Sequence, residues 1–293
     1  MNESNNNIYT TAFHHYKQLG LDPLPIPDIN GHPSKFPTQI GWPERAAGGD
    51  YTEADFAEAC NVGNLLGGPK NVTDIDCDSP EAIAVAGEIM DHFMEKTGKT
   101  MIFGRESKPK SHYIYECDVS LPSEQIRDPS DGECIVEFRC VDGDGSRGKQ
   151  TVFPPSQNYD PKTGITEQVR FEPDPPNPIA QVSATELHKR FLMIGAVSLL
   201  AKHFPAESER HNTILALAGT FGRSGMKLGK ATAIIGLAYR HSQGYNGDRT
   251  KAVSDVKSVY KTLDRSAKAR LYGYTNLTEI MPQVVIDKVL ELL

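Results

Sequence analysis

The pattern of hydrophobic and polar positions divides the chain into a mixed N-terminal region and a helical C-terminal region. Tyr9, Phe13, Tyr16 and Leu19 recur at helical spacing, which predicts an amphipathic helix over residues 8–20. Runs rich in β-branched and aromatic residues predict strands at residues 62–66, 72–76, 100–103, 112–115, 135–139 and 151–153. Cap signals place helices at residues 52–60 and 80–96. Residues 21–50, rich in Pro and Gly, are expected to form loops and short strands, and the Gly67-Gly68-Pro69 turn to join the first two predicted strands.

A proline-rich segment separates the two regions. Residues 154–182 contain seven prolines, which predicts an extended linker with one strand near residues 167–171. After it, helical periodicity continues to the C-terminus. The expected helices cover residues 185–203, 208–222, 227–242, 248–262 and 276–292. The fold class is therefore α+β followed by a small all-α bundle, with a first domain over residues 1–175, a linker over 176–184 and a helical domain over 185–293.

Charge is distributed unequally between the two regions. Residues 1–183 hold 15 basic and 29 acidic residues, and residues 184–293 hold 16 and 9, so the net charges are −14 and +7. The basic half indicates either a polyanionic partner or a solvated helical surface, and charge alone does not separate the two. No segment approaches the roughly 18 uninterrupted apolar residues of a membrane span, and the polar N-terminus lacks the order of a signal peptide. A cytoplasmic protein with no membrane partner is expected.

The cysteines agree with a reducing compartment. There are five of them, irregularly spaced and without a CxxC motif, which is typical of free thiols in the cytosol. A zinc site built from Cys117, Cys134, Cys140 and a histidine is the alternative, and it is disfavoured because strong zinc spacings are missing.

Two carboxylates stand out in the second predicted strand. Asp74 and Asp76 are two residues apart, so on a strand they point to the same face. Adjacent like charges are unfavourable unless a cation neutralises them, which makes the pair a candidate divalent-metal site. A surface turn is the alternative for this tripeptide taken alone. A DxD motif also occurs in sugar transferases.

Two further segments carry candidate chemistry. Arg105, Lys108, Lys110 and His112 fall within eight residues, and with Ser111 they could bind a triphosphate, although an ordinary basic hairpin loop explains them as well. Glu137 interrupts a hydrophobic strand and shares a face with Arg139, its simplest ion-pair partner.

In this order the segments resemble the archaeo-eukaryotic primase superfamily, specifically its bifunctional primase–polymerase (prim-pol) branch. That family has an acidic-x-acidic pair at a strand end, a small-x-His element on a later strand and a third acid on a strand after it. Asp74 and Asp76 match the first element, His112 the second and Glu137 the third. Glu137-Phe138-Arg139 followed by residues 150–156 is the most distinctive part, and Asn61-Val62-Gly63 is also similar. Lys110 departs from the family's small residue, with Ser111 adjacent.

The resemblance implies a primase–polymerase core with an RRM-like mixed or antiparallel sheet and template-dependent synthesis of primers in DNA replication. It implies that Asp74, Asp76 and Glu137 hold two Mg²⁺ or Mn²⁺ ions. It implies that His112 is catalytic and binds the incoming NTP or dNTP. Supporting contacts to the triphosphate are expected from Arg105, Lys110, Ser111 and Lys149.

The helical region resembles the small domain that follows many prim-pol cores. Arg210, His211 and Asn212 begin an expected helix, where free N–H groups favour an anion, and Arg223 follows near its end. The resemblance implies that these residues bind a single-stranded DNA template. A replicative helicase, fused or separate, is a further expected partner, and a bacterial, plasmid or phage context is expected.

Three rival interpretations remain at the level of sequence. The first is a non-catalytic primase-like replication initiator that binds single-stranded DNA. The second is a DxD sugar transferase, for which the basic helical region has no obvious use. The third is a generic two-domain binding protein in which the ordered elements coincide by chance.

Overall fold

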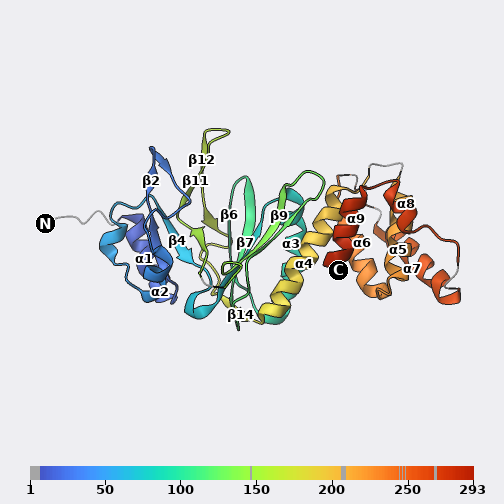
Figure 1. Cartoon of the computed structure of the whole chain (residues 1–293), viewed down its shortest axis with the longest axis horizontal. Helices are drawn as coiled ribbons and strands as arrows, with labels where there is room; N and C mark the ends of the chain where they lie inside the picture. The colour runs from blue at the N-terminus through green and yellow to red at the C-terminus, as the bar shows by residue number, and fades with distance from the viewer. Residues whose placement is uncertain are drawn as a thin grey trace. The chain divides into compact units, whose positions relative to one another are not determined.

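The computed structural model describes residues 7–145, 147–205, 209–243, 245, 247, 249–266 and 269–293 (Figure 1). These residues form helices and several antiparallel sheets, so the expected α+β class is confirmed. The chain divides into two compact units. The first comprises residues up to 78, 90–125 and 137–188; the second comprises residues 79–89, 126–136 and 189–293. The second unit thus takes two segments from within the expected first domain. In the described part of the chain, no helix is long and apolar enough to span a membrane.

The largest sheet has seven strands, and its long strand β7 (Lys108–Cys117) organises it. The order is β13 (Arg170–Phe171), β6 (Met101–Arg105), β7, β5 (Val72–Cys77), β9 (Cys134–Arg139) and β8 (Glu124–Arg127). Strand β7 pairs antiparallel with β5 and β6, and β14 (Ala180–Val182) adds to it in parallel. In the β5–β7 register, Asp76 lies opposite His112 and Asp74 opposite Ile114. This register places both aspartates and the histidine on one face of the sheet.

A second, antiparallel sheet consists of β1 (Pro23–Ile26), β4 (Asn61–Leu65) and β10 (Gln150–Phe153). The expectation that β4 and β5 are two strands joined by a turn at Gly67-Gly68-Pro69 is confirmed. Both strands exist, but they belong to different sheets, because the Gly68–Lys70 3-10 turn between them carries the chain from one sheet to the other. The turn therefore connects layers instead of closing a hairpin.

The prediction of an extended linker over residues 154–182 is wrong. The segment contains the hairpin of β11 (Gln157–Asp160) and β12 (Ile165–Gln168), then β13 on β6 and β14 on β7. All seven prolines lie between these strands, where a missing backbone N–H removes no ladder hydrogen bond. The proline density, which indicated extended chain, instead marks the connections between short strands.

Other local expectations were partly met. The expected loops at residues 21–50 include β2 (Asp28–Ile29), β3 (His32–Pro33) and a short helix α2 (Trp42–Gly48). The expected helix at residues 52–60 is only a 3-10 turn (Glu53–Phe56), although Thr52 and Asp55 form the expected capping box. Helices α1 (Ile8–Gln18) and α3 (Pro80–Thr97) lie as predicted.

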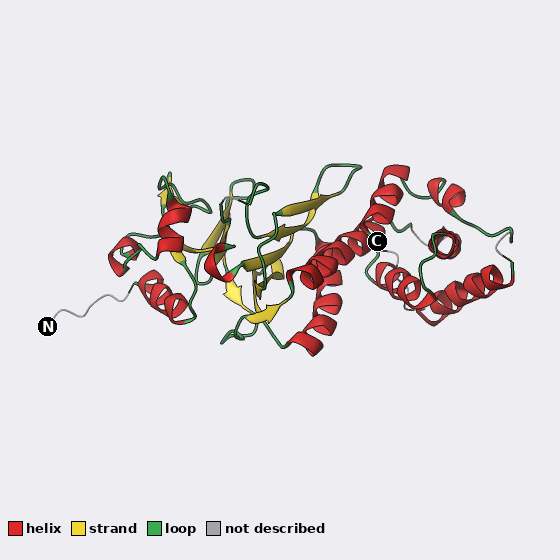
Figure 2. Cartoon of the chain, turned by 60° about the horizontal axis from the view of Figure 1, so that its bottom comes forward, coloured by secondary structure: helices red, strands yellow, loops and turns green. Residues whose placement is uncertain are grey.

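The helical region begins with α4 (Ala184–Lys202) and continues to the C-terminus (Figure 2). The other helices are α5 (Arg210–Arg223), α6 (Leu228–Arg240), α7 (Arg249–Arg265), α8 (Tyr274–Thr278) and α9 (Gln283–Leu292). The prediction of a single helix over residues 276–292 is wrong. The segment forms two helices, α8 and α9, and Pro282 is the N-cap of the second. Apolar faces, including Leu217, Ile235, Val256 and Val285, form the buried core of these helices.

The core of the first unit joins its two sheets to α1. Tyr16, Phe56, Phe103 and Phe153 are fully buried in it. The ring of Phe153, from β10, lies 4.8 Å from that of Phe103, from β6, and 5.5 Å from that of Tyr16. Burial of large aromatic side chains contributes strongly to stability. This packing holds β10 beside the face of the large sheet that carries Asp74 and Asp76.

Candidate active site

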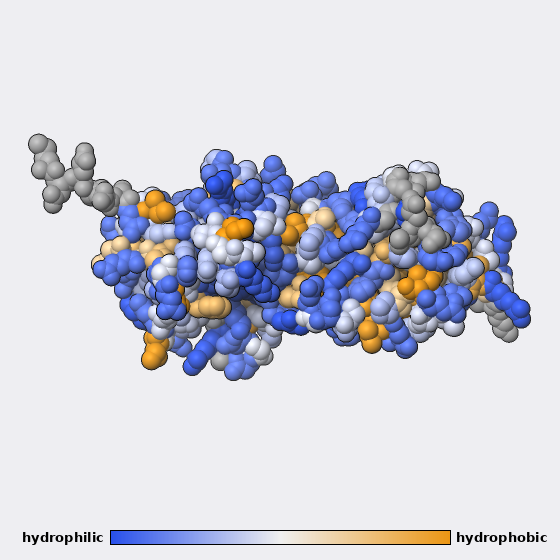
Figure 3. All heavy atoms as spheres, turned by 90° about the horizontal axis from the view of Figure 1, so that it is seen from above, coloured by the Kyte–Doolittle hydropathy of each residue, from blue (hydrophilic) through white to orange (hydrophobic). Residues whose placement is uncertain are grey.

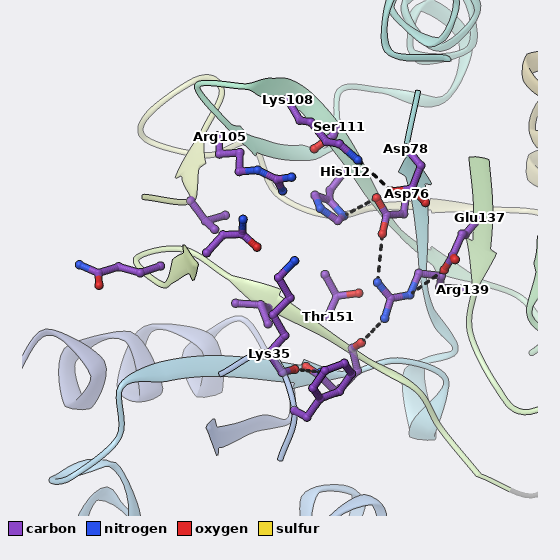
Figure 4. Close-up of a pocket in the computed structure, with 16 residues that line it drawn as sticks. Lys35, Asp76, Asp78, Arg105, Lys108, Ser111, His112, Glu137, Arg139 and Thr151 are labelled. Carbon is purple, nitrogen blue, oxygen red and sulfur yellow. Dashed lines mark hydrogen bonds and ion pairs between the residues drawn. The ribbon is translucent and has the colours of Figure 1, made fainter. Parts of the chain in front are cut away.

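A cavity of about 280 Å³ opens in the first unit, over the face of the large sheet that carries the acidic residues (Figure 4). Figure 4 shows Arg105, Lys108 and His112 on one side of it, with Lys35 and Thr151 on the other. Its polar lining comes from well-separated segments of the chain. The charged and polar residues that line it are Lys35, Asp76, Asp78, Arg105, Lys108, Ser111, His112, Glu137, Arg139, Gln150, Thr151, Gln157 and Asn158.

Asp74 is fully buried beneath this cavity and is held by two neighbours. Its carboxylate accepts a hydrogen bond from the Thr151 hydroxyl at 2.7 Å, and His112 Nδ1 lies 3.0 Å from the same oxygen. Asp76, one position further along this face of β5, lines the cavity itself. Its oxygens lie 3.0 Å from an Arg139 nitrogen and 3.6 Å from His112 Nδ1. The two aspartates therefore differ: one is part of the interior and the other faces the opening.

His112 connects both carboxylates to the interior of the sheet. Its ring stacks on Phe103 at 4.7 Å between centroids, which fixes the plane of the imidazole. Burial disfavours the charged ring, but Asp76 and Asp74 outweigh burial and raise the pKa of His112. Since Nδ1 is committed to the carboxylates, Nε2 is the ring nitrogen that can donate to a ligand oxygen.

Arg139 joins the third predicted acid to this group. On β9, Arg139 and Glu137 lie on the same face, and the Arg139 guanidinium contacts Asp76 at 3.0 Å and Glu137 at 3.6 Å. It also donates to the Gln150 carbonyl at 2.7 Å. Burial raises the pKa of Glu137, although Arg139 acts in the opposite direction. Arg139 is thus more than the simple partner of Glu137, because it bridges two of the three acids.

The donor atoms of Asp74, Asp76 and His112 fit a single divalent ion. One ligand atom from each lies within 4.8 Å of the others. Carboxylate oxygens suit Mg²⁺ and Mn²⁺, and an imidazole nitrogen adds preference for the transition metal. Glu137 does not belong to this group; one of its oxygens instead lies within 4.8 Å of ligand atoms of Asp78 and Cys134. The described residues thus offer two groups of possible ligands, and the Arg139 guanidinium contacts an acid of each, Asp76 and Glu137.

Positive charge converges on the cavity from three segments. Lys108 pairs with Asp78 at 3.0 Å, and Arg105 with Glu167 at 3.1 Å. Burial and the nearby charges of Arg105 and Lys108 lower the pKa of Lys35, although Asp76 and Asp78 act in the opposite direction. A polyanion placed among the three cations would be attracted by their positive charge.

The geometry of the β6–β7 hairpin decides which of its basic residues reach the cavity. A register shift between Phe103 and Arg105 marks a bulge at Gly104. A Cβ on Gly104 would lie 2.4 Å from the Lys108 carbonyl oxygen, so only glycine allows the strands to approach there. Lys110 has a φ of 50°, is exposed, and lies outside the cavity with its N–H bonded to Glu172. Lys108 takes the position expected of Lys110.

Ser111 and Lys149, like Lys108 and Lys110, differ in whether they line the cavity. Ser111 lines the cavity and is 1% exposed; among the described residues its hydroxyl has no hydrogen-bond partner. Lys149 lies outside the cavity and pairs with Asp142 at 2.6 Å. Among the described residues, none of the three cysteines considered for zinc forms a disulfide; Cys117 and Cys140 are buried and Cys134 is partly buried. Of Ser111 and Lys149, Ser111 is therefore the one whose polar atom is available to a ligand.

The four residues expected to contact DNA have structural partners in the second unit. Arg210 is 7% exposed, and His211 lies 2.9 Å from an Asp255 oxygen. Asn212 donates to Glu209 at 3.1 Å. Arg223 donates to backbone carbonyls of Gly219, Ala269, Leu271 and Tyr272. These contacts stabilise the ends of helices and the connection before α8, so Arg210 is buried and His211, Asn212 and Arg223 each have a partner among the described residues.

Several residues that line the cavity were missed by sequence reasoning, and three of them matter most for the site. Lys35 and Phe36 follow a two-residue strand in a segment expected to be loop, and no periodicity marks them. Thr151 reads as an ordinary strand residue, and only its contact with buried Asp74 reveals its importance. No protein-family model matches this chain, and no curated protein matches it.

Proposed function

We propose that the protein is a template-dependent nucleotidyltransferase of the primase–polymerase kind, which transfers nucleotides from NTPs or dNTPs to a 3′-hydroxyl. One observation carries this proposal. A single cavity combines the carboxylates of Asp76 and Glu137 with cations that come from three other segments. Carboxylates that bind divalent ions, placed beside cations that bind phosphates, are what in-line phosphoryl transfer requires. The α+β architecture is compatible with an RRM-like prim-pol core.

In this proposal the cationic side of the cavity binds the triphosphate. Lys35 and Lys108 act as point charges, and Arg105 offers a planar fork of donors. Ser111 Oγ and His112 Nε2–H donate to phosphate oxygens, since Nδ1 of the same ring faces the carboxylates of Asp74 and Asp76. Lys108 and Arg105 exchange their present carboxylate partners, Asp78 and Glu167, for phosphate oxygens.

The acidic side positions the reacting hydroxyl. Asp74, Asp76 and His112 would hold a divalent ion, which supplies charge neutralisation in the transition state and lowers the pKa of the attacking hydroxyl. Thr151 holds the buried Asp74 in place, so the carboxylate needs little rearrangement. Glu137 would join a second ion site when Arg139 turns from the carboxylates toward the phosphates.

The second unit would bind the template through exposed cations of α7. Lys257, Lys261 and Arg265 are exposed and spaced by four residues, so they lie along one face of this helix. Together with the +7 net charge of residues 184–293, they provide a sequence-independent contact for phosphates.

Incubation with a single-stranded DNA template, labelled NTPs or dNTPs and Mg²⁺ or Mn²⁺, with and without a primer, tests the proposal. Incorporation should require the metal and stop with a chelator. Asp76→Asn should reduce incorporation at least about 100-fold, because the neutral amide is a poor ligand for a hard cation. Asp91→Asn, the same change at an exposed position of α3 outside the cavity, should leave it unchanged.

Incorporation by Asp76→Asn at the wild-type rate would overturn the proposed role of the cavity. Transfer of a sugar from a nucleotide-sugar, without dependence on a template, would favour the sugar transferase instead. The circular dichroism of both variants should match that of wild type at the assay temperature, which separates lost chemistry from lost structure.

A non-catalytic replication initiator is the second candidate, and one observation favours it. The Arg139 guanidinium already contacts Asp76 and Glu137, so these acids are neutralised without a metal. A protein of that kind binds single-stranded DNA with an affinity that falls as salt rises, and it incorporates no nucleotide with either metal.

A further inference from the structure

An exposed aromatic ring stands at the entrance of the cavity. Phe36 is 71% exposed and still belongs to the lining of the cavity, next to Lys35. A single exposed apolar residue needs no explanation by itself. Figure 3 shows other hydrophobic residues as separate small areas on a mostly hydrophilic face. Phe36 differs from a scattered surface residue because of how its backbone is held.

The backbone of residues 34–36 is fixed by buried side chains from the second sheet. Asn61 of β4 is fully buried and donates to the Ser34 carbonyl at 2.7 Å. Gln150 of β10 donates to the Lys35 carbonyl at 2.6 Å. The Ser34 hydroxyl accepts from the Phe36 N–H at 2.9 Å. Buried side chains therefore hold the carbonyls of Ser34 and Lys35, and Ser34 in turn holds the Phe36 N–H, while the Phe36 ring faces solvent.

The anchoring residues also connect the segment to the opposite wall. Asn61 exchanges hydrogen bonds with the backbone of Gln157, at 2.8 Å and 2.7 Å. Gln150 lies against Gly63, where a Cβ would be 2.7 Å from its side-chain oxygen. The His32 ring stacks on the Tyr159 ring at 3.9 Å, just before the segment. These contacts give the Asn61-Val62-Gly63 sequence a purpose: it builds a rigid support for Lys35 and Phe36.

Two residues that line the cavity, Ser111 and Gln150, each carry a buried polar atom without a hydrogen-bond partner among the described residues. Their exposed fractions are 1% and 9%. The Gln150 side-chain oxygen faces Gly63 in the second sheet. Buried polar groups are normally satisfied, so it is the Ser111 hydroxyl that leaves a hydrogen bond for a ligand to complete.

We propose that Phe36 is the stacking platform for the base of the bound nucleoside triphosphate. Lys35 and Phe36 are consecutive on a rigid segment, so the ammonium group can contact phosphate while the ring contacts the base. Aromatic rings stack on any base, because every base presents a π-face. The platform therefore contributes affinity for nucleosides without selecting among bases. This assignment rests on the proposed function, since it identifies the part of the substrate that the same cavity binds.

Direct binding tests the assignment without relying on catalysis. Isothermal titration compares ATP, dCTP, inorganic tripolyphosphate and a single-stranded oligodeoxynucleotide, each with Mg²⁺, on the full chain. Phe36→Ala should weaken ATP and dCTP about 5- to 150-fold, the range typical of losing one base stack. Tripolyphosphate, which has no base, should bind the variant as it binds wild type.

Two further variants control the experiment. Ile40→Ala removes a fully exposed apolar side chain that does not line the cavity, and it should change no affinity. Phe36→Trp, made in a Trp42→Phe background so that the protein has a single tryptophan, should bind ATP at least as tightly as wild type. Its fluorescence should change on adding ATP and stay constant on adding tripolyphosphate.

The outcomes separate this assignment from the proposed function. If ATP binds and Phe36→Ala leaves its affinity unchanged, or weakens tripolyphosphate equally, the stacking role is overturned and the nucleotide site stands. An effect of Phe36→Ala confined to the oligodeoxynucleotide also overturns the assignment. If wild type binds neither ATP nor dCTP, both proposals are wrong. If nucleotides bind as expected but no template-dependent incorporation occurs, the platform stands and the polymerase proposal fails.

Discussion

Thr151→Val is expected to destabilise the first unit through a single hydrogen bond. The Thr151 side chain is 2% exposed and donates to Asp74, which is 0% exposed, at 2.7 Å. Valine has nearly the same shape, so the substitution removes the donor without leaving a cavity. A hydrogen bond to a charged group contributes about 1.5–3 kcal/mol, and a buried carboxylate that loses a donor also keeps its desolvation cost. We expect a loss of about 2 kcal/mol in the free energy of unfolding.

The sequence offers a convenient probe for this measurement. Trp42 is the only tryptophan and lies on α2, packed against the core of the first unit. Its fluorescence during urea unfolding therefore reports that unit. The midpoint should move to lower urea while the slope of the transition stays unchanged, because the change affects stability and not the surface exposed on unfolding.

A double-mutant cycle with Asp74→Asn isolates the bond. If the two side chains interact as described, the double variant should be at least about 1 kcal/mol more stable than the sum of the single changes indicates. Additivity within about 0.5 kcal/mol, or a Thr151→Val variant as stable as wild type, would refute the view that Thr151 holds the buried carboxylate.

Two further predictions concern the second unit. Burial raises the pKa of the Asp128 carboxyl, but hydrogen bonds from Ser130, Lys202 and His203 outweigh burial. They hold this pKa well below its usual range. Because the pKa is lowered in the folded state, ionised Asp128 contributes its full stabilisation above about pH 4, the ordinary pKa of aspartate. This contribution is lost as the pH falls toward the folded-state pKa. Asp128→Asn should therefore be less stable at pH 7 and lose less stability between pH 5 and pH 3, followed by circular dichroism at 222 nm. An unchanged acid limb would contradict this. Arg223→Ala removes donors to four backbone carbonyls and should lower the free energy of unfolding by about 1 kcal/mol. Its affinity for DNA should stay within twofold of the wild-type value. A large loss of DNA affinity in a stable variant would restore the role first expected of Arg223.

Local sequence signals determined much of the secondary structure. The apolar run around Asp74 and Asp76 forms strand β5, the Ser79-Pro80 cap signal begins α3, and Glu137 lies on β9. Alternation with a period of two also placed both aspartates on one face. These features depend on residues within one or two turns of chain, so periodicity and cap chemistry suffice to predict them.

Failures occurred where a segment's partner lay far away in sequence. Within residues 154–182, the short strands β13 and β14 are weak on their own and exist because β6 and β7 provide hydrogen-bonding edges. Strand propensity describes fit to a half-buried surface, so a short strand without its neighbour gives little signal. The same reasoning explains Arg210, whose burial depends on the packing of the surrounding helices.

By itself, the sequence determined the class of fold, the acidic pair and the histidine that accompanies it. Only the tertiary structure decided that Asp74 is interior and Asp76 accessible, that Arg139 bridges two acids, and that Lys108 takes the place expected of Lys110. It alone brought Lys35 and Phe36 to the cavity, supported by Asn61 and Gln150 from distant strands. The reason is that periodicity records which way a side chain points along its own element. Strand order, register and long-range burial decide what that side chain meets.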